Sequence, residues 1–131
     1  MAWIELHQSV IRHRKTTRAA AALGIRREAM LGHLVQLWCW GLDNVDADGA
    51  LNGISDEEIA AGAGWPERKA EALVQALVGA GWIDVDGTSG ARALHDWYEY
   101  AGKLLLKREK NRERMRRARA DHVQRKNGTR A

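Results

Sequence analysis

The chain has 131 residues, a formal net charge of +4, six tryptophans, no phenylalanine and one cysteine. This length allows one domain with a core of its own plus an appendage, and it excludes two ordinary domains. The single Cys39 excludes a disulfide framework and a cysteine-based metal site within the chain, and the sequence shows neither a secretion signal nor an apolar run of about eighteen residues. We therefore expect a cytoplasmic protein without a membrane partner, whose core is rich in indoles.

Two helices and a short strand are expected in the first part of the chain. An alanine-rich helix is predicted over 16–23 and is closed by Gly24, a residue suited to a left-handed C-cap. A second helix, over 27–43, is apolar on nearly every face, which places it at the centre of the domain. A turn signal at 48–49 precedes 50–52, a candidate edge strand.

A helix pair joined by a glycine turn follows. Ser55 stands three residues before Glu58, the arrangement of a capping box, so a helix is expected to start there and to run to residue 63. Gly64 ends it, and Pro66 suits the first position of the next helix. The spacing predicts two helices that meet at a tight turn.

The second helix of this pair is expected over 66–80, with Gly79 and Gly81 ending it. Its apolar residues share one face at helical spacing, and they are Ala70, Leu73, Val74 and Leu77. Two short segments, 82–85 and 91–95, then flank a glycine-containing turn and predict a β-hairpin.

The order of these elements predicts a mainly α fold with a small β-hairpin wing, that is, a winged helix-turn-helix domain over 1–97. The remaining residues, 98–131, form a basic tail. Its composition favours a helix to about His122, but few apolar residues follow Leu106, so most of the tail cannot pack on a core. We expect the first part of the tail to be helical.

Charge divides sharply between these two parts. Residues 1–97 carry nine Lys or Arg against thirteen Asp or Glu, a net of −4, whereas residues 98–131 carry twelve against four, a net of +8. A basic tail on a mildly acidic domain indicates a polyanionic partner such as nucleic acid. The alternative is a solvated tail whose charges have no partner.

Several segments resemble the N-terminal winged-helix domain of bacteriophage replication initiators, also called replisome organisers. The resemblance covers about residues 2–104 and is carried by Trp3-Ile4-Glu5-Leu6, His13-Arg14-Lys15-Thr16, Gly32-His33-Leu34-Val35-Gln36-Leu37-Trp38 and Leu94-His95-Asp96-Trp97. It implies DNA binding during phage replication, self-association, and recruitment of a helicase or its loader through a further C-terminal region. Because only the basic tail follows the winged helix here, we expect DNA binding rather than helicase loading.

Candidate DNA-binding residues fall into two groups. In a winged helix the second helix of the pair enters the major groove, where Arg68, Lys69 and Gln75 would face base edges. Two basic side chains on an acidic domain give weak affinity, so we assign phosphate binding to the tail, and about six phosphate contacts there would give a salt slope of roughly −5. The tail residues are Lys107, Arg108, Lys110, Asn111, Arg112, Arg114, Arg116, Arg117 and Arg119. Residues 111–119 loosely resemble the basic region of leucine-zipper factors, although no heptad array follows.

Two further basic sites are candidates for phosphate contacts. Arg92, on the returning strand of the wing, could reach a minor groove or a phosphate. A secondary basic cluster lies at the start of the first helix and consists of Arg12, Arg14, Lys15 and Arg18. Both have an ordinary alternative, which is a solvated surface charge without a partner.

No catalytic pattern is visible. The five histidines are scattered without metal-ligand spacing, and no Ser/His/Asp, phosphate-loop or paired-carboxylate motif is present, so we expect neither an enzyme nor a metal or cofactor. His33 is interpreted as a hydrogen-bonded core residue. Two other functions stay open, a self-assembly or protein-interaction module and a phage transcriptional repressor, which would require a dimer.

Overall fold

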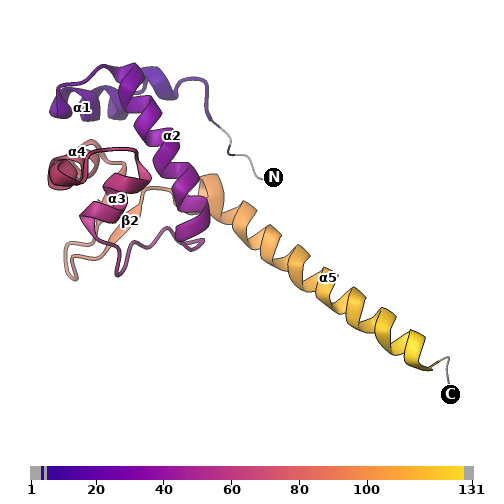
Figure 1. The fold of residues 1–131 in the computed structure, drawn as a ribbon. Coiled ribbons are helices and arrows are strands. Elements are labelled where there is room, and N and C mark those ends of the chain that lie inside the picture. The colour runs from indigo at the N-terminus through magenta and orange to yellow at the C-terminus, as the bar shows by residue number, and fades with distance from the viewer. Residues whose placement is uncertain (1–3, 5, 129–131) are drawn as a thin grey trace.

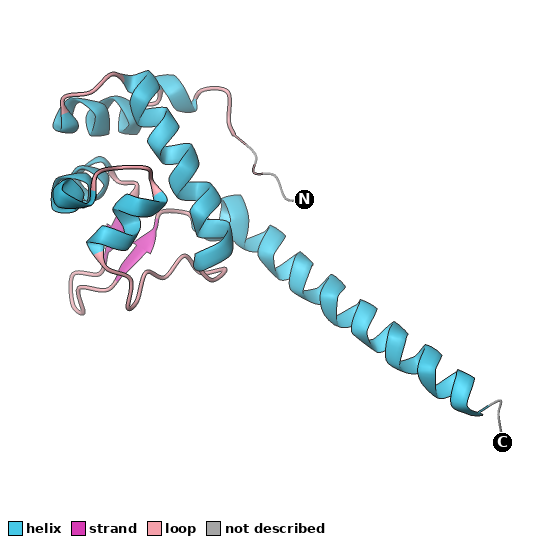
Figure 2. Cartoon of the chain, in the orientation of Figure 1, coloured by secondary structure: helices cyan, strands magenta, loops and turns pink. Residues whose placement is uncertain are grey.

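Five α-helices and one β-hairpin make up the part of the chain that the computed structural model describes, residues 4 and 6–128 (Figures 1 and 2). The helices are α1 (Arg14–Leu23), α2 (Arg27–Asn44), α3 (Asp56–Gly62), α4 (Ala70–Ala80) and α5 (Lys103–Gly128), and the strands are β1 (Ile83–Val85) and β2 (Arg92–Leu94). Two 3₁₀ turns, η1 (Val10–Arg12) and η2 (Glu67–Lys69), and a π-helical segment, η3 (Tyr98–Gly102), complete the set. The mainly α class with a small hairpin is confirmed. Trp3 and Glu5, two of the residues that carry the family resemblance, lie outside the described residues.

The first helix begins two positions before the predicted start. The imidazole of His13 accepts a hydrogen bond from the backbone N–H of Lys15 at 3.1 Å and so caps α1 at Arg14. At the other end Gly24 adopts a left-handed conformation with φ of 67°, as predicted. The second helix, α2, matches its predicted range to within one residue.

The core is aliphatic, and the prediction of an indole-rich core is wrong. The largest fully buried side chains include Met30, Leu34 and Leu37 of α2 and Leu73 and Leu77 of α4. Among the described tryptophans only Trp97 belongs to the buried core, and the others pack half-buried around it: Trp38, Trp40, Trp65 and Trp82. An indole is large and carries an N–H that needs an acceptor, so it is accommodated more readily at the edge of a core than at its centre.

The glycine-turn helix pair forms at the predicted place. Ser55 Oγ accepts the backbone N–H of Glu58 at 3.2 Å and caps α3, and Gly64 turns the chain with φ of 66°. Pro66 precedes the 3₁₀ turn η2 as its N-cap, rather than occupying the first position of the helix, and the regular α-helix begins only at Ala70. Gly81, with φ of 91°, ends α4, whereas Gly79 lies inside it.

The hairpin is short, with Ile83 opposite Leu94 in antiparallel register. The predicted strand over 50–52 is reduced to a single bridge between Ala50 and Ala93, next to which the N–H of Leu51 donates to the carbonyl of Arg92 at 2.9 Å. The loop between helices α2 and α3 is therefore attached to the outer edge of β2.

The segment that connects the globule to α5 has an unusual backbone conformation. Asp96 has φ of 51°, the one positive value at a described residue other than glycine, and η3 follows it directly. Core contacts continue beyond the boundary expected at residue 97, because Ala101 is buried and Leu105 packs against the core. The helix α5 then runs to Gly128, past the predicted end near His122. In Figure 1 it extends far from the rest of the molecule.

Candidate nucleic-acid interface

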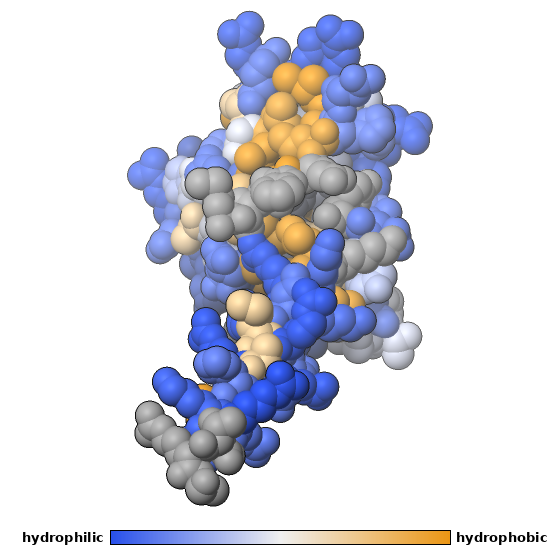
Figure 3. Space-filling view, turned by 90° about the vertical axis from the view of Figure 1, so that its right-hand side faces the viewer, coloured by the Kyte–Doolittle hydropathy of each residue, from blue (hydrophilic) through white to orange (hydrophobic). Residues whose placement is uncertain are grey.

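The basic tail is an exposed helix. Every residue over 109–127 is exposed, and at about 1.5 Å per residue the 26 residues of α5 span about 39 Å. Figure 3 shows hydrophilic residues over most of this helix, while apolar surface gathers on the globule. Few of the side chains of α5 therefore pack against the rest of the protein.

Basic side chains form two stripes on α5. At about 100° per residue, the first stripe lies on one side of the helix and consists of Lys107, Lys110, Arg114 and Arg117. The second stripe lies on the opposite side and consists of Arg108, Arg112, Arg116 and Arg119. The second set also lines one shallow hollow along the helix, together with Asn111 and Met115. The predicted tail residues are thus brought together on one rod, but on two of its faces.

The two sectors between the stripes differ in chemistry. One sector carries Asn111, Met115, Ala118 and His122, which follow each other at spacings of four, three and four residues. The opposite sector carries the carboxylates of Glu109 and Glu113. A helix with this distribution has one face without Lys, Arg, Asp or Glu, bordered by positive charge on both sides, and its acidic face points the other way.

Internal pairing takes up little of this charge. Arg117 donates to Glu113 at 2.9 Å across one turn, and Arg114 donates to the side-chain oxygen of Asn111 at 3.1 Å. Arg117 and Glu113 are 78% and 54% exposed in this pair. Exposed pairs of this kind are weak and are readily exchanged for a stronger partner such as a phosphate.

The predicted base-reading residues lie on the helix pair. Arg68 and Lys69 are exposed, but they belong to the 3₁₀ turn η2 rather than to regular helix. Gln75 is exposed on α4, where its amide donates to Glu71 at 3.2 Å. With Glu67 and Glu71 exposed beside the two basic residues, this surface has no net charge.

Arg92 has a structural role, which differs from the predicted phosphate contact. Its guanidinium pairs with the carboxylate of Asp56 and donates to the carbonyl of Ile54 at 2.8 Å. The arginine side chain is only 24% exposed. Arg92 therefore ties β2 to the start of α3, because both of these acceptors lie within its reach.

The secondary basic cluster is divided by the fold. Arg12, Arg14 and Arg18 are exposed on η1 and α1. Lys15 is half-buried, donates to the carbonyl of Gly81 at 3.3 Å, and lies 5.5 Å from the centre of the Trp82 ring. Lys15 thus joins α1 to the end of α4 and is the half-buried member of the cluster.

The basic surfaces do not converge. Figure 1 shows α1 and α4 at one end of the globule and α5 leaving from the other. The structure therefore does not bring Arg68 and Lys69 together with the stripes of α5. Any contact of α5 with nucleic acid is independent of α4 in this arrangement.

Among the residues described, no group of three or more His, Cys, Asp or Glu is arranged to hold a metal ion. No helix within the described ranges is long and apolar enough to cross a membrane. His33 Nδ1 lies 2.7 Å from the carbonyl oxygen of Ala63, which confirms the predicted hydrogen bond, but the residue is half-buried rather than part of the buried core.

Comparison of the chain with protein-family models, with curated proteins and with solved structures finds no match. The residues that sequence reasoning missed are Met115, Ala118 and His122, which share the uncharged sector of α5 with the predicted Asn111. Their helical spacing was the available signal, but it has meaning only once the segment is known to be one continuous helix.

Proposed function

We propose that this chain is a non-enzymatic DNA-binding protein in which α5 supplies the affinity for phosphates. The observation that supports this is the pair of basic stripes on an exposed, continuous helix about 39 Å long. A helix that lies in the major groove meets a phosphate backbone on each side, and two opposed stripes fit that geometry. The uncharged sector with Asn111 would then face the base edges, and Glu109 and Glu113 would face solvent.

The globule would act as a winged helix-turn-helix. Its element order supports this, because the central helix α2, the bridge at Ala50, the pair α3 and α4, and the hairpin follow one another as the fold requires. The neutral surface around Arg68 and Lys69 would add orientation and sequence preference rather than affinity. Together with the family resemblance, this favours a cytoplasmic protein of the phage replication-initiator type.

A truncation tests the division of labour. Removing 107–131 leaves Leu105, which packs on the core, and deletes both basic stripes. We expect the full chain to bind labelled duplex DNA with a steep salt dependence, and the truncated chain to lose most of that binding when both are titrated at about 50 mM and about 200 mM salt. A parallel titration with single-stranded DNA measures strand preference. Equal affinity of the two chains for DNA would overturn the proposal.

One observation favours a second candidate, a protein-interaction module. The exposed surface of η2 and the start of α4 balances Arg68 and Lys69 against Glu67 and Glu71, a charge distribution better suited to a protein than to phosphate. This function predicts that residues 1–106 associate with themselves. Sedimentation equilibrium of the truncated chain distinguishes a monomer from an assembly.

A further inference from the structure

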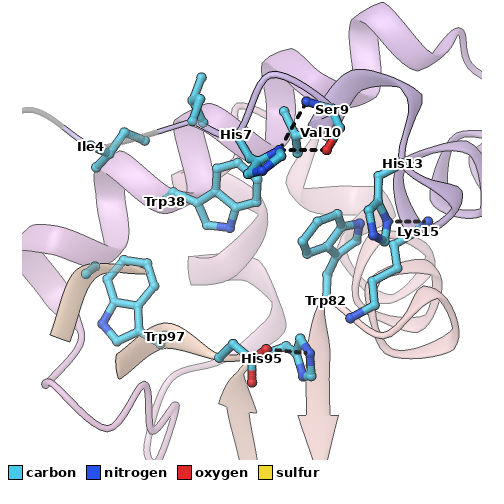
Figure 4. A pocket seen from close by; sticks show the side chains of 13 residues that line it. Ile4, His7, Ser9, Val10, His13, Lys15, Trp38, Trp82, His95 and Trp97 are labelled. Atoms are coloured by element: carbon cyan, nitrogen blue, oxygen red, sulfur yellow. Dashed lines mark hydrogen bonds and ion pairs between the residues drawn. The ribbon is translucent and has the colours of Figure 1, made fainter. Parts of the chain in front are cut away.

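A cavity of about 390 Å³ lies where the globule joins α5. Its lining comes from the N-terminal arm, η1, α1, α2, the residue before β1 and the turn after β2, and it reaches Ala101 of η3. Figure 4 shows Trp38, Trp82 and Trp97 on three sides of this space, with His95 on a fourth. The half-buried tryptophans that were expected in the core are instead used in part to form this cavity.

The aromatic walls are held in place by close packing. A Cβ on Gly41 or on Gly49 would lie only 2.7 Å from an atom of Trp97, so that indole fits against bare backbone on two sides. The rings of Trp38 and Trp82 meet edge to face, with centroids 5.5 Å apart. Walls fixed in this way lose little conformational entropy when a ligand enters.

Polar and charged side chains line part of the cavity, among them Lys15, His95 and Asp96. The indole N–H groups of Trp82 and Trp97 are buried without an acceptor among the described residues and are closed to solvent, so these indoles offer the cavity their rings rather than their donors. Lys15 Nζ also lines the space and has donors to spare beyond its bond to Gly81. The carboxylate of Asp96 is already paired with His95 Nε2 at 3.2 Å. A matching ligand is therefore flat and aromatic, and it carries an acceptor or a negative charge that Lys15 can bind.

We propose that this cavity binds one unpaired nucleobase. A nucleobase is planar, stacks on indoles, and presents ring nitrogens and carbonyl oxygens as acceptors, and the volume lies in the range of small-molecule sites. The cavity also reaches Ala101, just before the basic helix, so a strand held by α5 could place an unpaired base in it. We expect the base to come from a strand end next to a bound duplex rather than from a free nucleotide, and this part of the inference rests on the proposed function. The ability of the cavity to bind a base does not depend on that function.

The test follows the indole N–H resonances of the full chain by two-dimensional NMR. Deoxyadenosine and deoxythymidine monophosphates are the probes, and ribose 5-phosphate is the control that lacks a base. We expect the resonances of Trp38, Trp82 and Trp97 to shift with either nucleotide and not with the control, and those of Trp40 and Trp65 to stay in place. Absence of shifts at millimolar nucleotide, or equal shifts at all of these tryptophans, would overturn the proposal.

Two variants and a matched control establish the location. Val10→Phe fills the cavity from η1, and Trp38→Leu removes one wall; each is expected to weaken nucleotide binding at least about fivefold. Ala61→Phe adds the same ring at an exposed position of α3 and should leave binding unchanged. Thermal unfolding monitored by circular dichroism verifies that each variant is folded. Unchanged nucleotide binding in folded Val10→Phe and Trp38→Leu would also refute the cavity as the site.

A last comparison separates this inference from the proposed function. A blunt duplex and the same duplex with a three-base overhang are added to the wild type and to a variant carrying Arg112→Glu and Arg116→Glu. Shifts of the cavity tryptophans with the overhang alone identify the strand end as the source of the base, whereas shifts with mononucleotides alone identify a free nucleotide. If the variant keeps its duplex affinity, the role of α5 is wrong while nucleotide binding in the cavity stands.

Discussion

Neutralising one basic stripe of α5 should change the salt dependence of DNA binding by a calculable amount. Arg112, Arg116 and Arg119 are exposed and line the same side of the helix. Each phosphate contact contributes about 0.9 to the slope of log affinity against log salt, so replacing all three with glutamine should reduce a slope of about −5 to about −2. Between about 50 mM and about 200 mM salt, the affinity of the wild type then falls by about three orders of magnitude and that of the variant by less than two.

Fluorescence anisotropy of a labelled duplex at four salt concentrations measures both slopes. The control is the triple lysine variant of the same positions, which keeps the charge and should keep a slope near −5, because counterion release depends on charge rather than on guanidinium geometry. A glutamine variant whose slope equals that of the wild type would show that this stripe does not contact phosphates. A lysine variant that loses as much as the glutamine variant would refute the electrostatic reasoning itself.

Three further predictions concern the globule. Replacing Arg68 and Lys69 with alanine should reduce discrimination between DNA sequences in a random-pool selection while changing the salt slope by at most about two. Arg92→Ala removes the partly buried bonds to Asp56 and Ile54 and should lower the free energy of unfolding by about 2 kcal/mol in urea titrations, whereas a surface charge without a role would give no change. Backbone N–H groups of the hairpin turn hold the pKa of Asp86 below its usual range. A lowered pKa in the folded state stabilises the protein above the unfolded pKa, so the stability difference between the wild type and Asp86→Ala should be present at pH 7 and shrink as the pH falls below about 4. A difference that grows on acidification would contradict this assignment.

Local sequence signals were sufficient for most of the fold. Gly24, Ser55 and Gly64 each imposed a cap or a turn through their own backbone chemistry, and such effects need no knowledge of distant residues. Where the outcome depended on contacts far along the chain, prediction failed. Arg92 pairs with Asp56, 36 positions away, and Lys15 donates to Gly81, 66 positions away. Neither interaction can be predicted from the spacing of nearby residues.

The aromatic cavity was beyond sequence reasoning for the same reason. Trp38 belongs to α2, whereas Trp82 and Trp97 flank the hairpin, and each one alone is indistinguishable from an ordinary core residue. The charge of the tail could be read directly, but its division into two stripes could not. That division requires a single uninterrupted helix through 107–119, and the sequence favoured a helix there by composition alone, without apolar residues that would fix it against a core.

The continuity of α5 also links its stability to its proposed partner. Along the helix, like charges stand four residues apart at Arg108 and Arg112, at Arg112 and Arg116, and at Lys110 and Arg114, and each such pair disfavours the helix. One attractive pair, Glu113 with Arg117, is weak because it is exposed. No core packing offsets this repulsion over 109–127, where every residue is exposed. Phosphates along both stripes would replace this repulsion with attraction. The closely spaced basic residues that destabilise the α5 helix in isolation would therefore stabilise it when it is bound to a polyanion.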